Sequence, residues 1–131
     1  MPGSFAPIDA ATEAWVTETI DAALAVHKAL GPGFLERAYE QALRLELRAR
    51  NINYESQRSV WVSYRKTRLL AQRIDLIVES CVLVEIKAVA RLDPVFVSQV
   101  VSYLRATQLR VGLLMNFNSL YLKDGLRRIV L

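Results

Sequence analysis

Arg73-Ile-Asp-Leu-Ile-Val-Glu-Ser-Cys-Val-Leu-Val-Glu-Ile-Lys87 is the stretch that decides the fold. Aliphatic and β-branched residues dominate it, and Glu79-Ser80 interrupts them, which predicts two strands joined by a tight turn. Three ionisable residues, Asp75, Glu85 and Lys87, stand inside the apolar runs. The pattern therefore indicates an antiparallel hairpin that carries charged groups into a largely apolar sheet.

The length of the turn decides whether these charges meet. Glu85 and Lys87 share one face, because side chains alternate along a strand. Asp75 joins them if it pairs opposite Glu85, which needs a three-residue tip, Glu79-Ser80-Cys81, or a bulge, whereas a two-residue turn would pair Asp75 with Val84. Two facing carboxylates repel unless a cation lies between them, and hard oxygen ligands suit Mg²⁺ or Mn²⁺. An ordinary hairpin with an exposed ion pair is the alternative.

Composition narrows the class of protein. The 131 residues are 53% hydrophobic and 23% charged, which predicts one folded domain over residues 1–131, with 1–8 as a loose lead-in. No apolar run reaches the roughly 18 residues of a membrane span, and a signal-peptide pattern is missing, so we expect a cytoplasmic protein without a membrane partner. One cysteine and one histidine exclude a zinc site of the usual kind. A net charge of +4 tolerates a phosphate-bearing partner without requiring one.

A helix precedes the hairpin by some distance along the chain. Asp9 or Thr12 can cap it, and Gly31-Pro32-Gly33 ends it after about Leu30. His27 falls on the apolar stripe of this helix. A buried, hydrogen-bonded histidine is the more common situation, and a catalytic histidine is the alternative.

A second helix is predicted over residues 34–50, and it carries an acid in an unusual position. Glu36 lies in line with Tyr39, Leu43 and Leu47 at 100° per residue. A carboxylate on an apolar face must find a cation, a hydrogen-bond donor or a proton. Simple stabilisation of an anion at a helix N-terminus explains the position equally well.

The remaining segments complete a mixed α/β pattern. We expect an alternating strand over 54–64, a helix capped by Asp93 over 94–107, a buried strand over 111–117 and a final strand over 126–131. The turn at 65–67 joins the first strand to the strand carrying Asp75, so three strands form an antiparallel meander. Gln99 and Tyr103 lie one helical turn apart and could project together into a cleft, although an ordinary amphipathic edge has the same spacing.

In this order, Asp75, Glu85-Ile86-Lys87 and Gln99-Val-Val-Ser-Tyr103 resemble the PD-(D/E)XK nuclease superfamily. Gly33-Phe-Leu-Glu36-Arg-Ala-Tyr39 matches the signature that names its GxxExxY family, and residues 26–33 and 111–117 are similar to that family as well. The resemblance covers residues 12 to 131. The Glu-Ile-Lys element alone is weak, whereas the whole set in this order is specific. Ile74 stands where the superfamily pattern has proline, at a position that varies.

The resemblance implies a restriction-endonuclease-like core, in which a mixed central sheet of a three-strand antiparallel meander plus two further strands is flanked by helices. It also implies roles for individual residues. The implied metal ligands for Mg²⁺ or Mn²⁺ are Glu36, Asp75 and Glu85, the lysine that positions or activates water is Lys87, and the residue that orients the site is Gln99. Further pocket candidates are His27, Tyr39 and Tyr103. A single shared metal would account for three carboxylates that otherwise need separate explanations.

Two functional hypotheses from different classes follow. The first is a metal-dependent nuclease that hydrolyses phosphodiester bonds of nucleic acid, with DNA favoured over RNA. The second is a catalytically silent module that retains the nuclease fold and binds nucleic acid or protein. The chain has little length beyond the core for gripping DNA, and a homodimer could supply the missing surface. An enzyme acting on a small phosphorylated molecule is a third and weaker hypothesis.

Overall fold

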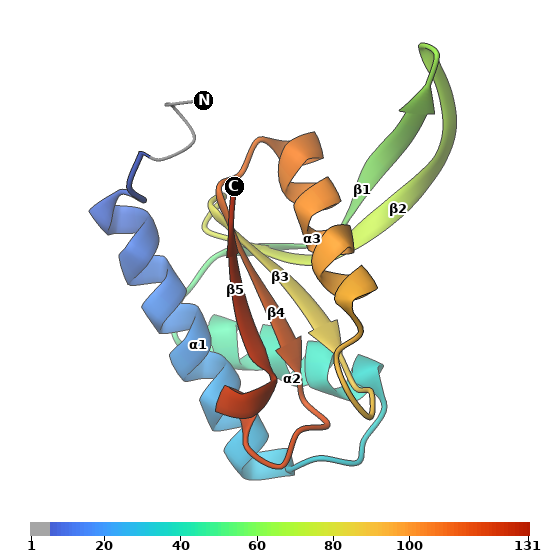
Figure 1. Cartoon of the computed structure of the whole chain (residues 1–131). Coiled ribbons are helices and arrows are strands. Elements are labelled where there is room, and N and C mark those ends of the chain that lie inside the picture. The colour runs from blue at the N-terminus through green and yellow to red at the C-terminus, as the bar shows by residue number, and fades with distance from the viewer. Residues whose placement is uncertain (1–5) are drawn as a thin grey trace.

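The computed structural model describes residues 6–131 and shows a five-stranded sheet with helices on both faces (Figure 1). In chain order the elements are α1 (Ala10–Leu30), α2 (Glu36–Ala49), β1 (Tyr54–Tyr64), β2 (Thr67–Val78), β3 (Val82–Lys87), α3 (Pro94–Thr107), β4 (Val111–Asn116), the 3-10 helix η2 (Leu122–Gly125) and β5 (Leu126–Val130). The strand order is β1-β2-β3-β4-β5, with β3 and β4 parallel and all other neighbours antiparallel. The expected α/β class, mixed sheet and three-strand meander are therefore confirmed.

The hairpin between β2 and β3 has the three-residue tip. Its paired residues are Leu76–Val84, Ile77–Leu83 and Val78–Val82. Glu79 and Ser80 adopt left-handed φ values of 48° and 59°, and the Cys81 N–H donates to the Val78 carbonyl at 3.0 Å. Continuing this register by one residue brings Asp75 opposite Glu85.

Both faces of the sheet are covered by apolar layers. Helices α1 and α2 pack on one face, where Leu43 and Leu47 are fully buried against the strand residues Val84 and Ile86. Helix α3 covers the other face, in front of the sheet in Figure 1. Its position is set partly by its start, because the Asp93 carboxylate caps it and accepts from the Val95 N–H at 3.0 Å. The two layers leave the carboxyl end of β3 between α2 and α3.

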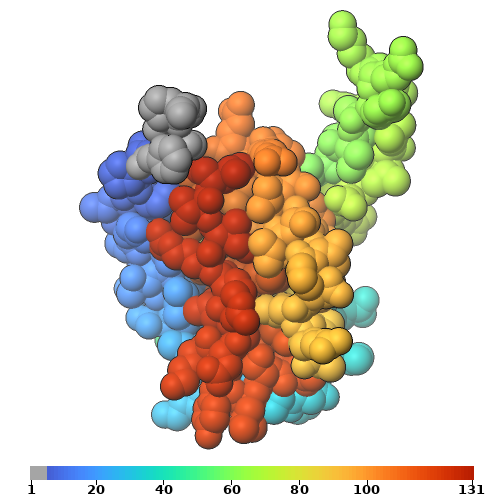
Figure 2. Space-filling view, in the orientation of Figure 1, coloured from blue at the N-terminus to red at the C-terminus, as the bar shows by residue number. Residues whose placement is uncertain are grey.

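A two-stranded ribbon extends beyond these layers. We define residues 58–73, at the far ends of β1 and β2, as the arm. Figures 1 and 2 show that the outer part of the arm stands clear of the body of the molecule, whereas Val60 at its base packs against the α3 layer. Every residue from Trp61 to Arg73 is exposed, whereas the next residue, Ile74, is fully buried. The boundary between core and arm therefore lies one residue before Asp75.

Arg110 joins the two ends of the described chain. Its guanidinium donates to the Ala6 carbonyl at 2.8 Å and to the Pro7 carbonyl at 3.2 Å, and its Nε donates to the Leu131 carbonyl at 3.1 Å. The expected loose lead-in is thus held at Ala6 and Pro7, while its residues 1–5 lie outside the described residues. Within residues 6–131, no helix has the length and apolar character needed to cross a membrane.

The closeness of α3 to β4 gives a first prediction. A Cβ added at Gly112 would lie 2.7 Å from Val100 Cγ1, so Gly112→Ala should overpack this face and lower the free energy of unfolding by about 1–3 kcal/mol. Urea unfolding of the single variants and of Gly112→Ala/Val100→Ala measures the coupling. Val100→Ala should cost less in the Gly112→Ala background than in wild type. Additive effects would contradict a clash between these two side chains.

Candidate active site

Asp75 and Glu85 replace part of the backbone ladder between β2 and β3 with their side chains. The Asp75 N–H donates to Glu85 Oε1 at 3.1 Å, and the Ile86 N–H donates to Asp75 Oδ2 at 2.8 Å. Each carboxylate therefore accepts from the backbone of the opposite strand. Only 9% of Asp75 and 3% of Glu85 is exposed, so two acids lie next to each other largely shielded from bulk water.

Burial dominates the electrostatics of this pair. It raises the pKa of Asp75 to about 6, against the opposing effect of the Ile86 N–H. The pKa of Glu85 is raised to about 8, first by burial and then by the charge on Asp75. Like charges this close cannot both ionise at low cost, so the pair retains a proton near neutral pH when no cation is bound.

Lys87 lies beside the pair on the same face of β3. Its Nζ is 4.0 Å from Glu85 Oε2 and 4.6 Å from the centroid of the Phe96 ring. The side chain is 14% exposed, so the ammonium group keeps a limited opening to solvent. A carboxylate on one side and an aromatic face on the other thus fix the position of a single cation.

The α3 side of the site is a hollow of about 380 Å³ that Lys87 and Gln99 line. The Gln99 Nε2 donates to the Tyr103 hydroxyl at 3.1 Å. The Gln99 Oε1 is buried, and no group within residues 6–131 hydrogen-bonds to it. Burial and the nearby charge of Glu85 raise the pKa of Tyr103. The hydrogen bond between Gln99 and Tyr103, which lie one helical turn apart, thus leaves the buried Gln99 Oε1 free to accept.

The α2 side is a second hollow, of about 520 Å³, which we name the acidic hollow. It is lined by Glu36, Arg37, Glu40, Gln41, Arg44, Gln57, Arg73 and Asp75. Glu36 is exposed here, which corrects the expectation that it lies on the buried face of its helix. The apolar layer begins only at Tyr39, one turn later, so the first turn of α2 extends past it. Partial desolvation nevertheless raises the pKa of Glu36, and the charge of Lys87 opposes this.

Gln57 and Glu40 belong to the acidic hollow although no motif points to them. The Gln57 Nε2 donates to Glu40 Oε2 at 2.8 Å and approaches Asp75 Oδ1 at 3.4 Å. Gln57 has a left-handed φ of 54° in the middle of β1, at the point of the ladder opposite Asp75. A non-glycine residue in this conformation is uncommon and marks a constrained position. The ladder is thus interrupted on both sides of Asp75.

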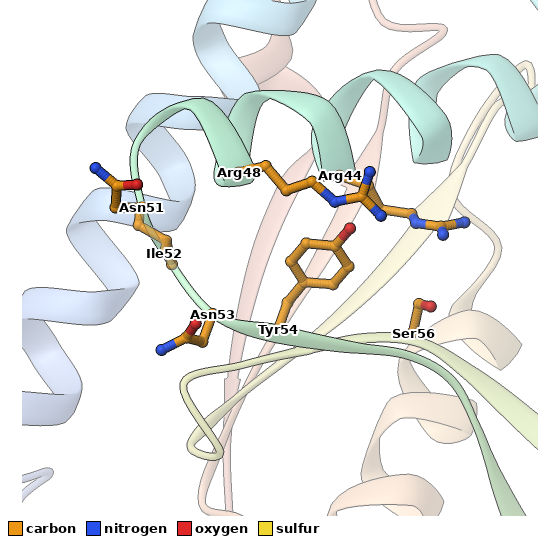
Figure 3. Close-up of a pocket in the computed structure, with 7 residues that line it drawn as sticks. All are labelled: Arg44, Arg48, Asn51, Ile52, Asn53, Tyr54 and Ser56. Carbon is orange, nitrogen blue, oxygen red and sulfur yellow. The ribbon is translucent and has the colours of Figure 1, made fainter.

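A third hollow, of about 480 Å³, adjoins the acidic hollow, because Arg44 lines both (Figure 3). Arg44 and Arg48 extend from α2 over Tyr54, whose ring centroid is 5.7 Å from the Arg48 Cζ. The Tyr54 hydroxyl is buried and has no hydrogen-bond partner in the described part of the chain. The lining of this third hollow includes two arginines and no acidic residue, whereas three acids and three arginines line the acidic hollow.

Two of the pocket candidates lie apart from the carboxylate pair. The Tyr39 hydroxyl donates to the Gly31 carbonyl at 2.6 Å, and its ring stacks on Phe117 at 4.8 Å. His27 is buried, with its Nε2 2.8 Å from the Ser119 carbonyl, and it lines a different hollow beside η2. The contacts of both residues hold loops against α1 and the sheet. His27 is thus a buried, hydrogen-bonded histidine, which is the more common of its two interpretations.

The donor set can be compared with the needs of a divalent cation. Among residues 6–131, no three His, Cys, Asp or Glu side chains come close enough to hold an ion together, so Glu36 does not complete a trio with Asp75 and Glu85. Each of these two carboxylates keeps one oxygen away from the backbone N–H groups. Mg²⁺ is usually bound by one or two carboxylates, several waters and the substrate phosphate. The buried pair therefore fits such an ion as a two-carboxylate site.

One family of known proteins matches most of the chain. The family model described as the PD-(D/E)XK nuclease superfamily matches residues 13–129, which include every residue of the hollows on the α2 and α3 sides. No curated protein and no solved structure matches the chain.

The raised pKa values of the pair predict how stability depends on pH. Because the folded state binds protons more tightly than the unfolded chain between about pH 4 and pH 8, the free energy of unfolding in EDTA should fall as pH rises through this range. The total decrease over this range is on the order of a few kcal/mol, and Glu85→Gln should remove most of it. Urea unfolding at a series of pH values measures it. Glu18→Gln, at an exposed carboxylate, should keep the wild-type slope, and an unchanged slope in Glu85→Gln would contradict the assignment.

Proposed function

Since the chain belongs to the PD-(D/E)XK nuclease superfamily, we propose that it hydrolyses phosphodiester bonds of nucleic acid, DNA in preference to RNA, with the help of a divalent cation. The observation that carries this proposal is the buried pair Asp75 and Glu85, with the Lys87 Nζ 4.0 Å from Glu85 Oε2. Burying two acids side by side is unfavourable for a folded chain on its own, and a cation removes the penalty. A structural ion pair would need only one acid.

Asp75 and Glu85 are the residues that would hold Mg²⁺ or Mn²⁺. Such an ion, when bound, draws charge from the scissile phosphate and lowers the pKa of a bound water. The two hydrogen bonds from the opposite strands fix both carboxylates before any ligand arrives, so little reorganisation accompanies binding. Glu36, which lines the acidic hollow from an exposed position, acts through water rather than as a direct ligand in this proposal.

Lys87 and Gln99 act on the water and on the phosphate. The Lys87 ammonium, fixed between Glu85 and Phe96, donates hydrogen bonds toward the attacking water or the charge that develops on the phosphate. The buried, unpartnered Gln99 Oε1 accepts a hydrogen from that water, which orients it. Tyr103 is a positioning residue, because its hydroxyl accepts from the Gln99 Nε2 and leaves Oε1 available.

We also propose that the chain is a member of the GxxExxY family. This is supported by the segment Gly33 to Tyr39, in which Gly33 has a φ of 109° that favours glycine. The Tyr39 hydroxyl accepts from the Phe34 N–H at 3.1 Å and donates to the Gly31 carbonyl. The signature thus holds the loop that presents Glu36 at the start of α2.

A catalytically silent binding module is the second candidate. It is favoured by one observation: within the described residues, no three acidic side chains come close enough together to hold one ion. Calorimetry separates the two functions. Tight binding of nucleic acid with no uptake of Mg²⁺ or Mn²⁺ at millimolar concentration would favour the module.

The nuclease proposal predicts the outcome of a cleavage assay. Wild type with Mg²⁺ or Mn²⁺ should cleave at least one of a set of single- and double-stranded DNA and RNA substrates. Lys87→Met should lower kcat by about 10²–10³-fold, the loss typical for one electrostatic donor. Lys123→Met, at an exposed lysine, is the matched control and should retain activity. Cleavage that survives intact in both Asp75→Asn and Lys87→Met would assign the activity to another site or a contaminant.

The same site predicts coupling between metal and stability. At 100 times the dissociation constant, Mn²⁺ should stabilise the fold by about 2.7 kcal/mol, which raises Tm by several degrees. Asp75→Asn keeps an acceptor for the Ile86 N–H, relieves the repulsion and should abolish the shift. Thermal scans of both proteins in EDTA and in Mn²⁺ test this. An equal shift in the variant, or none in wild type, would remove the physical basis of the metal site.

A further inference from the structure

The arm, residues 58–73, is strongly basic. It contains five cationic residues and no acidic one: Arg58, Arg65, Lys66, Arg68 and Arg73. Arg58 forms an ion pair with Glu55 at 3.7 Å, and the other four form no salt bridge within residues 6–131. Like charges on an exposed ribbon repel one another and weaken it. Their concentration on one projecting element points to an anionic partner.

The arm also exposes large apolar side chains. Trp61 is 50% exposed, and Tyr64, Leu69 and Leu70 are each more than half exposed. An isolated two-stranded ribbon is marginally stable in water, so these side chains contribute little by packing on one another. Basic residues interleaved with exposed aromatic ones are the usual composition of a surface that binds single-stranded nucleic acid.

One face of the arm is continuous with the candidate active site. Residues two apart on a strand share a face, so Asp75, Arg73 and Ala71 lie on the same side of β2. Trp61 pairs with Ala71 across the ribbon, and Arg73 lines the acidic hollow together with Asp75. Trp61 therefore lies on this face, four strand residues or about 13 Å from the level of Asp75.

The surroundings of Trp61 leave one side of its ring open. Its neighbours on this face are the small residues Ser59 and Ser63 on β1 and Ala71 on β2. The Arg68 guanidinium lies over the ring, 5.0 Å from its centroid. An indole that an arginine covers on one side and that is half exposed offers a surface on which a base can stack.

We propose that this face of the arm is the track for a single-stranded segment of nucleic acid that leaves the active site. Trp61 stacks on an unpaired base, and Arg68 and Arg73 contact the phosphates on either side. The substrate class rests on the proposed function, but binding on the arm does not require cleavage.

Tryptophan fluorescence tests this proposal directly. The chain has two tryptophans, so Trp15→Phe leaves Trp61 as the sole tryptophan, and its emission is excited selectively over that of the tyrosines. In EDTA, which prevents cleavage, a single-stranded oligothymidine should quench this emission in a saturable manner, and a blunt duplex of equal length should quench it less. Trp61→Ala, followed by anisotropy of a labelled oligonucleotide, should weaken binding about ten- to hundredfold, whereas Trp61→Phe should retain most of the affinity.

Salt dependence tests the cationic part of the track. Arg68→Gln and Arg73→Gln should each reduce the slope of log affinity against log salt concentration by about one. Arg105→Gln, an exposed arginine on α3, is the matched control and should leave the slope unchanged. Equal slopes in all three variants would overturn the phosphate contacts.

Two further results would overturn the track. The first is tight binding of oligothymidine without quenching of Trp61. The second is a shift of Trp61 emission with protein concentration alone, accompanied by a dimer on sizing, because the face would then be a contact between two copies of the chain. Failure of the nuclease proposal is distinguishable from failure of the track. Quenching of Trp61 by oligothymidine without cleavage in Mg²⁺ would overturn the nuclease proposal and support the track. Cleavage in Mg²⁺ without quenching of Trp61 would support the nuclease proposal and overturn the track.

Discussion

Two hydrogen bonds between β2 and β3, from the Asp75 N–H to the Glu85 carboxylate and from the Ile86 N–H to the Asp75 carboxylate, are the interaction on which the rest of the structure depends. Two strands of a sheet normally satisfy each other's backbone, yet here two carboxylates accept these hydrogen bonds. The arrangement fixes both acids and also buries them, which raises both pKa values. The three-residue tip of the hairpin and the layers of α2 and α3 hold a local geometry that is unfavourable until a cation joins it.

The fold was predictable where the signals are local. Alternation limited the turn of the hairpin to a few alternatives, of which the three-residue tip at 79–81 is the one found, and the aspartates that begin α1 and α3 are ordinary capping residues. The order of the strands in the sheet was harder to predict from the sequence. Strand β4 lies parallel to β3, with α3 as the crossover, and its uniformly buried residues indicate an interior strand without naming its neighbours.

The candidate site was predictable to the extent that register determines it. Asp75, Glu85 and Lys87 meet because of alternation along two paired strands. The exposure of Glu36 was not predictable in this way. The spacing of residues along a helix indicates on which side of the axis a side chain lies, but not at which turn the apolar layer begins. Gln57 was hidden by a shift in register between Val62 and Ser63. Counting back from the turn without that shift places Gln57 opposite Ile74, so no analysis of spacing brings it to Asp75.

Arg110 has a consequence for the architecture of larger proteins. It holds Ala6, Pro7 and Leu131 at one point, just before β4 begins. Val111 pairs with Val82 at the start of β3, whereas Lys87 pairs with Asn116 at the other end of these parallel strands. Ala6, Pro7 and Leu131 therefore lie together at the end of the parallel strands that is remote from Lys87. A circular permutant in which a linker joins Ala6 to Leu131 should therefore keep the pocket beside Lys87 open.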